Sequence, residues 1–367
     1  KTYLLQILTA FSNFNAKKFA SRNKKGYNLS MIYVAFILLA TAVVFLSIKL
    51  SKYVDLLDKT TNVSGAFIGG VLLAAVTSLP ELFTSLSAVL FLKQNNLVTG
   101  NILGSNVFNL AALGICLVIM FRGFSNSKIS KHYVFTILAC LCVYGLISVA
   151  IFVKNTPKLG FVNIVSPFIF VIYVVSLFIT PKTEEPEEKT ESPLSKKQLL
   201  LRFIAAAVLL VAVSIVITYV SDSIAEKLEL GKTFAGALLL GLTTSLPELV
   251  STVSLCKRGN FNAATGNILG SNIFNFLILF IADLLSFRKG NTDVYPHFLN
   301  GAEGFQAMLL LVLGAAATIA ALAVVLVKTS APEKKLLGKT AAISGGTVMT
   351  SAYLLFLILS TTLTGIA

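Results

Sequence analysis

Long apolar runs, bounded by charged or polar residues, recur along the whole chain. Many are about 20 residues long, which is the length of a helix that crosses the hydrocarbon core of a bilayer. The pattern predicts ten membrane-spanning helices, over residues 32–50, 65–92, 97–121, 133–153, 160–180, 199–220, 233–256, 262–286, 305–327 and 340–364. The expected fold class is therefore an all-α polytopic membrane protein.

Polar segments divide these spans into groups. Residues 181–198 are rich in Pro, Glu and Lys, a composition typical of a disordered linker, and they separate five spans from five. We therefore expect a first five-helix repeat over 31–180 and a second over 199–367. In residues 1–30 the apolar run is too short to span, so this segment is predicted to be interfacial or the end of an upstream helix.

Composition agrees with membrane residence. Of 367 residues, 56% are hydrophobic and 13% are charged, too few charged groups to cover the surface of a soluble domain. The net charge of +14 comes from Lys and Arg in short segments between apolar runs, which indicates a positive-inside bias and anionic lipid rather than nucleic acid. The loops on the side of the 181–198 linker carry the larger basic share, so that side is predicted to be cytoplasmic. The basic residues of 1–30 then fall outside, a conflict that a further upstream helix would remove.

An internal duplication is the most informative feature. Residues 77–82 and 244–249 both read TSLPEL, while 100–109 read GNILGSNVFN and 266–275 read GNILGSNIFN. The two motifs recur at the same spacing to within one residue. Because each half holds an odd number of spans, fusion head to tail places the halves in opposite orientations, as in the inverted repeats of secondary transporters.

Glu81 and Glu248 are the only acidic residues deep inside the predicted spans, and no Lys, Arg or His lies inside a span to pair with them. A charge at the bilayer centre costs roughly 3 kcal/mol or more unless it is compensated. A bound cation, or protons, would compensate both carboxylates. Each Glu also follows a Pro, which breaks the helix and frees backbone carbonyls, and such irregular backbone is tolerated at this depth only where it lines a cavity.

Helical spacing adds further oxygen ligands. Residues three or four positions apart share a helix face, so the expected ligands beside the two glutamates are Thr77, Ser78, Ser105 and Asn109 in the first half and Thr244, Ser245, Ser271 and Asn275 in the second. Sites built only from oxygen suit hard cations such as Ca²⁺. The neighbouring asparagines, Asn101, Asn106, Asn267 and Asn272, are expected to brace the broken helices rather than contact ions.

These paired motifs resemble the two α-repeats of the sodium/calcium exchangers, in the cation/Ca²⁺ antiporter superfamily. The resemblance implies ten helices in two inverted five-helix repeats, alternating access, and ion coordination around Glu81 and Glu248. It also implies that Ala74 and Gly241 offer backbone carbonyls to Na⁺. One departure is that Asn occupies both positions 109 and 275, where relatives often carry Asp in one repeat, so the site has two acids rather than three.

The function predicted from the sequence is Na⁺/Ca²⁺ exchange, with H⁺/Ca²⁺ exchange through the same glutamates as the alternative. The TSLPE motif, in place of the Gly-Asn-Ala-x-Glu type of the proton/calcium exchangers, favours Na⁺ by analogy. A passive channel fits two inverted repeats less well, and the spans lack the groups of an enzyme active site. The expected partners are Ca²⁺ and Na⁺ as substrates together with membrane lipids, without a cofactor, nucleic acid or obligate protein partner. The expected location is the plasma membrane.

Overall fold

A computed structural model describes residues 29–60, 77–153, 157–159, 162–179, 195–288, 294–299, 301–331 and 333–364. Within them, seven helices are long and apolar enough to cross a bilayer. These are α3 (Leu29–Thr60), α6 (Asn95–Ile119), α8 (Tyr133–Phe152), α10 (Lys196–Lys227), α14 (Phe261–Arg288), α15 (Gly301–Ser330) and α16 (Lys335–Thr364). The chain is therefore nearly all-helical and of a multi-pass membrane type, as predicted.

Shorter pieces complete the described chain. One group is α5 (Leu79–Ser87), continued by a π-helical turn, η1 (Ala88–Leu92). The other is α11 (Lys232–Ala235), the π-helical η2 (Gly236–Gly241), α12 (Leu242–Thr244) and α13 (Leu246–Lys257), which together make an eighth candidate span bent by 47°. The remaining pieces are α7 (Phe121–Asn126), β1 (Lys158–Leu159), β2 (Val162–Asn163) and α9 (Val165–Ile179).

One predicted span differs from the structure, and another is described only in part. The span expected over 160–180 begins with a hairpin, in which Lys158 pairs with Asn163 and Leu159 with Val162, and its helix starts only at Val165. The span expected over 65–92 is described from residue 77 onward, and residues 1–28 and 180–194 also lie outside the described chain. Among the described residues there are thus seven long apolar helices, or eight spans if the bent pair counts as one, and two shorter apolar helices over 79–92 and 165–178.

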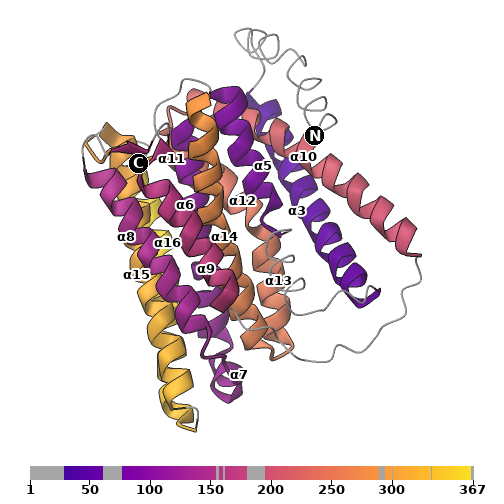
Figure 1. Ribbon diagram of the computed structural model, residues 1–367, viewed down its shortest axis with the longest axis vertical. Helices are drawn as coiled ribbons and strands as arrows, with labels where there is room; N and C mark the ends of the chain where they lie inside the picture. The colour runs from indigo at the N-terminus through magenta and orange to yellow at the C-terminus, as the bar shows by residue number, and fades with distance from the viewer. Residues whose placement is uncertain are drawn as a thin grey trace.

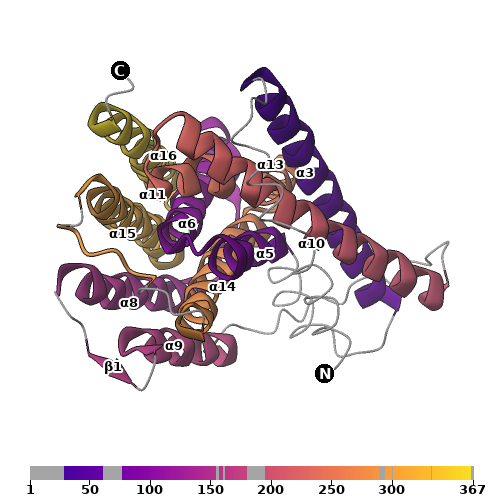
Figure 2. The same cartoon turned by 90° about the horizontal axis from the view of Figure 1, so that it is seen from above.

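The helices form two groups around a central core. Figures 1 and 2 show α5, α6 and α14 in the middle, α8, α9, α15 and α16 along one side, and α3 packed beside α10 on the other. Burial follows this arrangement: 78% of the apolar stretch of α6 is buried, but only 17% of that of α3 or α10. Exposed aliphatic side chains such as Ile37 and Leu201 cover α3 and α10. A surface of this kind is stable against lipid rather than water.

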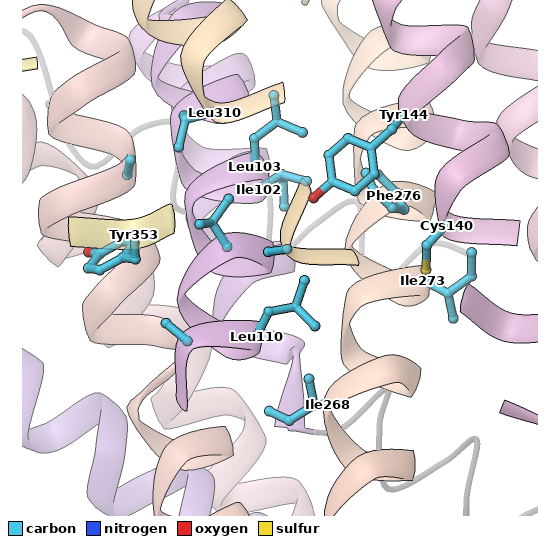
Figure 3. Close-up of a cluster of buried hydrophobic side chains, with 14 of the residues drawn as sticks. Ile102, Leu103, Leu110, Cys140, Tyr144, Ile268, Ile273, Phe276, Leu310 and Tyr353 are labelled. Carbon is cyan, nitrogen blue, oxygen red and sulfur yellow. The ribbon is translucent and has the colours of Figure 1, made fainter. Parts of the chain in front are cut away.

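Aromatic and aliphatic side chains fill the core between α6, α8, α14 and α15. The rings of Tyr144 and Phe276 meet edge to face with their centroids 5.1 Å apart, and Figure 3 shows them beside Leu103 and Leu310. Edge-to-face pairs add to the stabilisation that burial gives. This packing fixes the central part of α14, which also carries Ser271 and Asn275.

Helix α6 approaches the bent span at backbone contact distance. A Cβ atom on Gly100 would lie 1.9 Å from the carbonyl oxygen of Thr233, and one on Gly236 would lie 2.3 Å from that of Leu97. Only glycine allows two backbones to come this close. The small residues of the GNILGSN motif therefore bring the polar face of α6 against the break near Ser245.

Candidate functional site

The two TSLPEL motifs adopt the same local conformation. Ser78 has φ −89° and ψ 11°, and Ser245 has φ −91° and ψ 2°, just before α5 and α13. This sparsely populated region of backbone space is common at functional sites. The following prolines, Pro80 and Pro247, lie in the first turn of their helices, where a missing N–H is tolerated. The predicted helix break is therefore present at Ser245, where α12 and α13 meet at 47°.

The break places each glutamate in the first turn of its helix, where the helix dipole favours a negative charge. Ser245 Oγ donates to Glu81 Oε1 at 2.9 Å, and Ser78 Oγ donates to Glu248 Oε1 at 3.4 Å. The two bonds cross between the repeats, so the helix starts lie side by side. All four side chains have no exposed surface.

Neither carboxylate has a basic partner in the part of the chain that the structure describes, where the ion pairs are those of Lys232 with Asp222 and Glu226. Glu81 and Glu248 also lie close enough to repel each other. In each of them the second oxygen, Oε2, is buried without a hydrogen-bond donor. Two such groups are stable in a membrane only if protons or a cation bind them.

The threonines of the motifs lie at the same place. Thr77 and Thr244 are buried, each one residue before a serine that bonds a glutamate of the other repeat. Thr244 Oγ1 donates to the carbonyl oxygen of Leu240, one turn earlier. Because a hydroxyl that donates keeps its acceptor lone pairs, Thr244 Oγ1 can still serve as an oxygen ligand.

Helices α6 and α14 contribute the predicted serines and asparagines. Ser105 Oγ donates to the carbonyl oxygen of Gly241 at 3.2 Å, whereas Ser271 Oγ is buried without a hydrogen-bond partner. The Oδ1 atoms of Asn109 and Asn275 are likewise buried and accept no hydrogen bond. The structure thus buries every described residue of the predicted site. Ala74 lies outside the described residues.

Gly241 lies at the end of the π-helical turn, directly before the break. Its carbonyl oxygen accepts from Ser105 Oγ and from the backbone N–H of Ser245, each at 3.2 Å. The carbonyl that the family resemblance implies as a Na⁺ ligand is therefore at the break, but it already serves as an acceptor that ties α6 to the bent span.

The neighbouring asparagines divide into two kinds. Asn101 donates to Thr84 Oγ1 and Ser85 Oγ, and Asn267 donates to Thr252 Oγ1, so these two brace the helices after the breaks, as expected. Asn106 and Asn272 differ from that expectation. They join α6 to α14, each through its Nδ2 atom to the backbone carbonyl of the other. Sequence spacing could not reveal this because it depends on how the two helices cross.

Two buried charges were missed by the sequence analysis. Asp283, on α14, is 3% exposed, and its Oδ2 accepts from the N–H of Asn163 and from Ser166 Oγ. Lys328 lies inside α15, beyond the span predicted to end at 327, and its Nζ donates to the carbonyl oxygen of Ser125. Asp283 holds β2 and the start of α9 against α14, Lys328 holds α7 against α15, and neither is bonded to Glu81 or Glu248.

The acceptors left without a donor are all oxygens. Among the residues predicted as ligands, these acceptors are Glu81 Oε2, Glu248 Oε2, Asn109 Oδ1, Asn275 Oδ1 and Ser271 Oγ. Among the described residues no group of three or more His, Cys, Asp or Glu side chains gathers as a metal site. The donor set consequently contains two carboxylates with amide and hydroxyl oxygens, which suits a hard cation rather than a transition metal.

A multi-pass helical protein with a broken span and a buried, all-oxygen site is a membrane cation transporter by class. The profile of the family described as sodium/calcium exchanger protein matches residues 31–180 and 198–362. The chain belongs to this family, which confirms the resemblance seen in the two α-repeat motifs.

Individual relatives show the breadth of this family. The chain is 29% identical over 305 residues to the sodium/calcium exchanger MaX1 of Methanosarcina acetivorans, covering 69% of this chain and 84% of that protein. It is 26% identical over 264 residues to the inner membrane protein YrbG of Escherichia coli, covering 66% and 78%. It is also 26% identical over 252 residues to the vacuolar calcium ion transporter of Schizosaccharomyces pombe, covering 62% and 60%.

Solved structures share the fold. The H⁺/Ca²⁺ exchanger CAX superposes with a TM-score of 0.60 at 14% identity, covering 98% of this chain and 97% of that one. The sodium-calcium exchanger NCX_Mj superposes with a TM-score of 0.55 at 21% identity, covering 89% and 98%. At these identities the comparison establishes the fold. It does not determine the coupling ion of this chain, because the similar structures include both an H⁺/Ca²⁺ exchanger and a sodium-calcium exchanger.

Proposed function

We propose that this chain is a Na⁺/Ca²⁺ antiporter that binds Ca²⁺ and Na⁺ in turn between Glu81 and Glu248. The observation that carries the proposal is the reciprocal pair of bonds from Ser245 to Glu81 and from Ser78 to Glu248, which leaves one oxygen of each carboxylate without a donor. With two bidentate carboxylates and the amide and hydroxyl oxygens, the site reaches the roughly 6–8 ligands that Ca²⁺ takes.

We further propose that the architecture is ten transmembrane helices in two inverted repeats. Helices α3 and α10 occupy equivalent places before the two motifs. Figure 1 shows α5 in the upper half of the molecule and α13 in the lower half. Inverted halves would present one site to the two sides of the membrane by equivalent movements.

Alternating access would then use the helices that are least tied to the core. In this proposal the α3–α10 pair slides against the remaining helices, because most of its apolar surface faces outward and little would be lost on movement. The helices that carry the site would stay fixed. Both Ca²⁺ and Na⁺ are substrates in this scheme, no resident cofactor takes part, and the chain catalyses no covalent chemistry.

Sodium is the proposed counter-ion for two reasons. The TSLPEL motifs are of the kind found in the sodium-coupled branch, and one relative carries the name sodium/calcium exchanger. Proton coupling is the second candidate, because two carboxylates bind either one Ca²⁺ or two protons with equal charge. The structural similarity to an H⁺/Ca²⁺ exchanger favours testing it alongside. We place the protein in the plasma membrane, with the 181–198 linker in the cytoplasm.

Reconstituted vesicles separate these possibilities. Vesicles loaded with Na⁺ are diluted into Na⁺-free buffer that contains radiolabelled Ca²⁺, and a parallel set carries only a pH gradient. Uptake that depends on the Na⁺ gradient supports the proposal, and uptake driven by the pH gradient alone supports the proton-coupled alternative. Uptake that depends on neither gradient contradicts both.

The glutamates are tested in the same assay. Glu81→Gln and Glu248→Gln are each expected to reduce gradient-driven uptake to background, because an amide cannot supply the charge that the cation neutralises. Glu226→Gln makes the same chemical change at a side chain that is 67% exposed and distant from the motifs in the sequence. It is expected to retain wild-type uptake, which separates loss of the site from a general effect of removing a carboxylate.

A further inference from the structure

Four asparagines form a closed hydrogen-bonded arrangement where α6 crosses α14. The role proposed for it below rests on the cation site proposed above. Asn109 Nδ2 donates to Asn272 Oδ1 at 3.0 Å, and Asn275 Nδ2 donates to Asn106 Oδ1 at 2.9 Å. Asn272 Nδ2 in turn donates to the backbone oxygen of Asn106 at 3.1 Å, and Asn106 Nδ2 donates to that of Asn272 at 3.3 Å. All four side chains are buried.

The direction of every bond in this arrangement follows from the backbone. A carbonyl oxygen can only accept a hydrogen bond, so Asn272 must turn its NH₂ group toward the backbone of Asn106. Its Oδ1 atom then faces Asn109, which must answer with its own NH₂ group. The Oδ1 atom of Asn109 is left pointing away without a donor.

The same constraints apply from the backbone of Asn272 through Asn106 to Asn275. The backbone oxygen of Asn272 fixes the amide of Asn106, and Asn106 Oδ1 fixes the amide of Asn275. The Oδ1 atom of Asn275 is again left without a donor. If either Asn109 or Asn275 turned over, two acceptors would meet in a buried place, at a cost of about 1–3 kcal/mol.

We propose that Asn106 and Asn272 are positioning residues, which fix the amides of Asn275 and Asn109 so that both carbonyl oxygens face the transported cation. The pairing is crosswise: Asn106 acts on Asn275, and Asn272 acts on Asn109. Fixed ligand orientation by a surrounding hydrogen bond is a common means of tuning metal affinity, and its loss weakens binding about 10- to 100-fold.

The crosswise pairing gives a double-mutant test, with Ca²⁺ affinity of the purified protein measured by isothermal titration calorimetry. Asn106→Ala and Asn275→Ala are each expected to weaken Ca²⁺ binding about 10- to 100-fold. The Asn106→Ala/Asn275→Ala double variant is expected to bind Ca²⁺ as well as the weaker-binding of the two single variants. Once the amide of Asn275 is removed, Asn106 has nothing left to orient. Asn106→Ala combined with Asn109→Ala is expected to weaken binding more than either single variant, because Asn109 is oriented by Asn272 Oδ1 and not by Asn106.

A purely structural role for Asn106 predicts a different result. The loss of Ca²⁺ affinity in Asn106→Ala would then multiply with the loss in Asn275→Ala and with the loss in Asn109→Ala alike, and this result overturns the proposal. Asn262→Ala is the matched control: it removes an amide at the start of α14 that accepts from the Ser130 N–H, outside both motifs, and it is expected to keep wild-type affinity. Unfolding temperatures of all variants in detergent show whether each is folded.

An isosteric variant covers the case in which the alanine variants do not fold. Asn275→Asp has no hydrogen to donate to Asn106 Oδ1, so Ca²⁺ binding is expected to weaken although a negative charge is added. Tighter binding by this variant overturns the proposal. The outcomes also separate the inference from the function: a wild-type protein that does not bind Ca²⁺ refutes the function, whereas wild-type binding with multiplicative losses refutes only the positioning role.

Discussion

Ser245 donates a hydrogen bond of 2.9 Å to Glu81, although the two residues belong to different halves of the chain. Its counterpart, from Ser78 to Glu248, is longer at 3.4 Å. Each serine lies three residues before the glutamate of its own motif, but it bonds the glutamate of the other. The two halves therefore meet at the proposed site, and this geometry needs both of them.

We expect these two serines to contribute unequally. A hydrogen bond to a carboxylate contributes about 1.5–3 kcal/mol, so Ser245→Ala is expected to weaken Ca²⁺ binding about tenfold or more. Ser78→Ala should have a smaller effect because its bond is long. Calorimetry of both variants tests this, with Ser148→Ala as a control whose hydroxyl bonds its own helix. Equal losses for Ser78 and Ser245 would contradict the expectation.

Protons are expected to compete with Ca²⁺ at this site. Ca²⁺ binds the deprotonated carboxylates, so affinity is present at high pH and is lost as the pH falls. Ca²⁺ binding in a weakly acidic, lightly buffered solution should release protons, and Glu81→Gln should release fewer. The measurement is the pH change on adding Ca²⁺. An affinity that does not vary with pH would show that Glu81 and Glu248 are not ligands.

The close approach of α6 to the bent span predicts a strong effect of a single methyl group. Gly100→Ala places a Cβ atom 1.9 Å from the Thr233 backbone and is expected to lower stability by at least about 1–3 kcal/mol. Gly145→Ala, in α8, has no atom within 4 Å of its Cβ position and serves as the matched control. Thermal unfolding in detergent is the measurement. A similar loss in both variants would mean that the approach is looser than described.

Asp283 is expected to be a structural acid rather than an ion ligand. Asp283→Ala leaves the Asn163 N–H and Ser166 Oγ without this acceptor, so the free energy of unfolding should fall by about 1–3 kcal/mol. Ca²⁺ affinity of the folded variant should stay at the wild-type value. A loss of affinity as large as that of Glu81→Gln would instead place Asp283 on the ion pathway.

The sequence by itself determined the membrane class, most of the long apolar helices and the residues of the candidate site. Apolar runs of bilayer length indicate a membrane protein rather than a soluble one. A duplicated Pro-Glu motif inside such runs indicates a cation or proton site, because a carboxylate at that depth needs compensation. The burial of Glu81, Glu248 and the polar residues around them followed from helical spacing. These properties depend on local pattern, which the chain carries in its order of residues.

Tertiary structure decided the rest. That Ser245 bonds Glu81 rather than Glu248, that Asn106 and Asn272 connect α6 to α14, and that Asp283 is buried against Asn163 all depend on contacts between segments more than a hundred residues apart. The hairpin before α9 depends on such contacts too, because Asn163 is held by Asp283. Spacing within one helix cannot reveal them, since they arise from how separate helices cross and how closely their backbones approach.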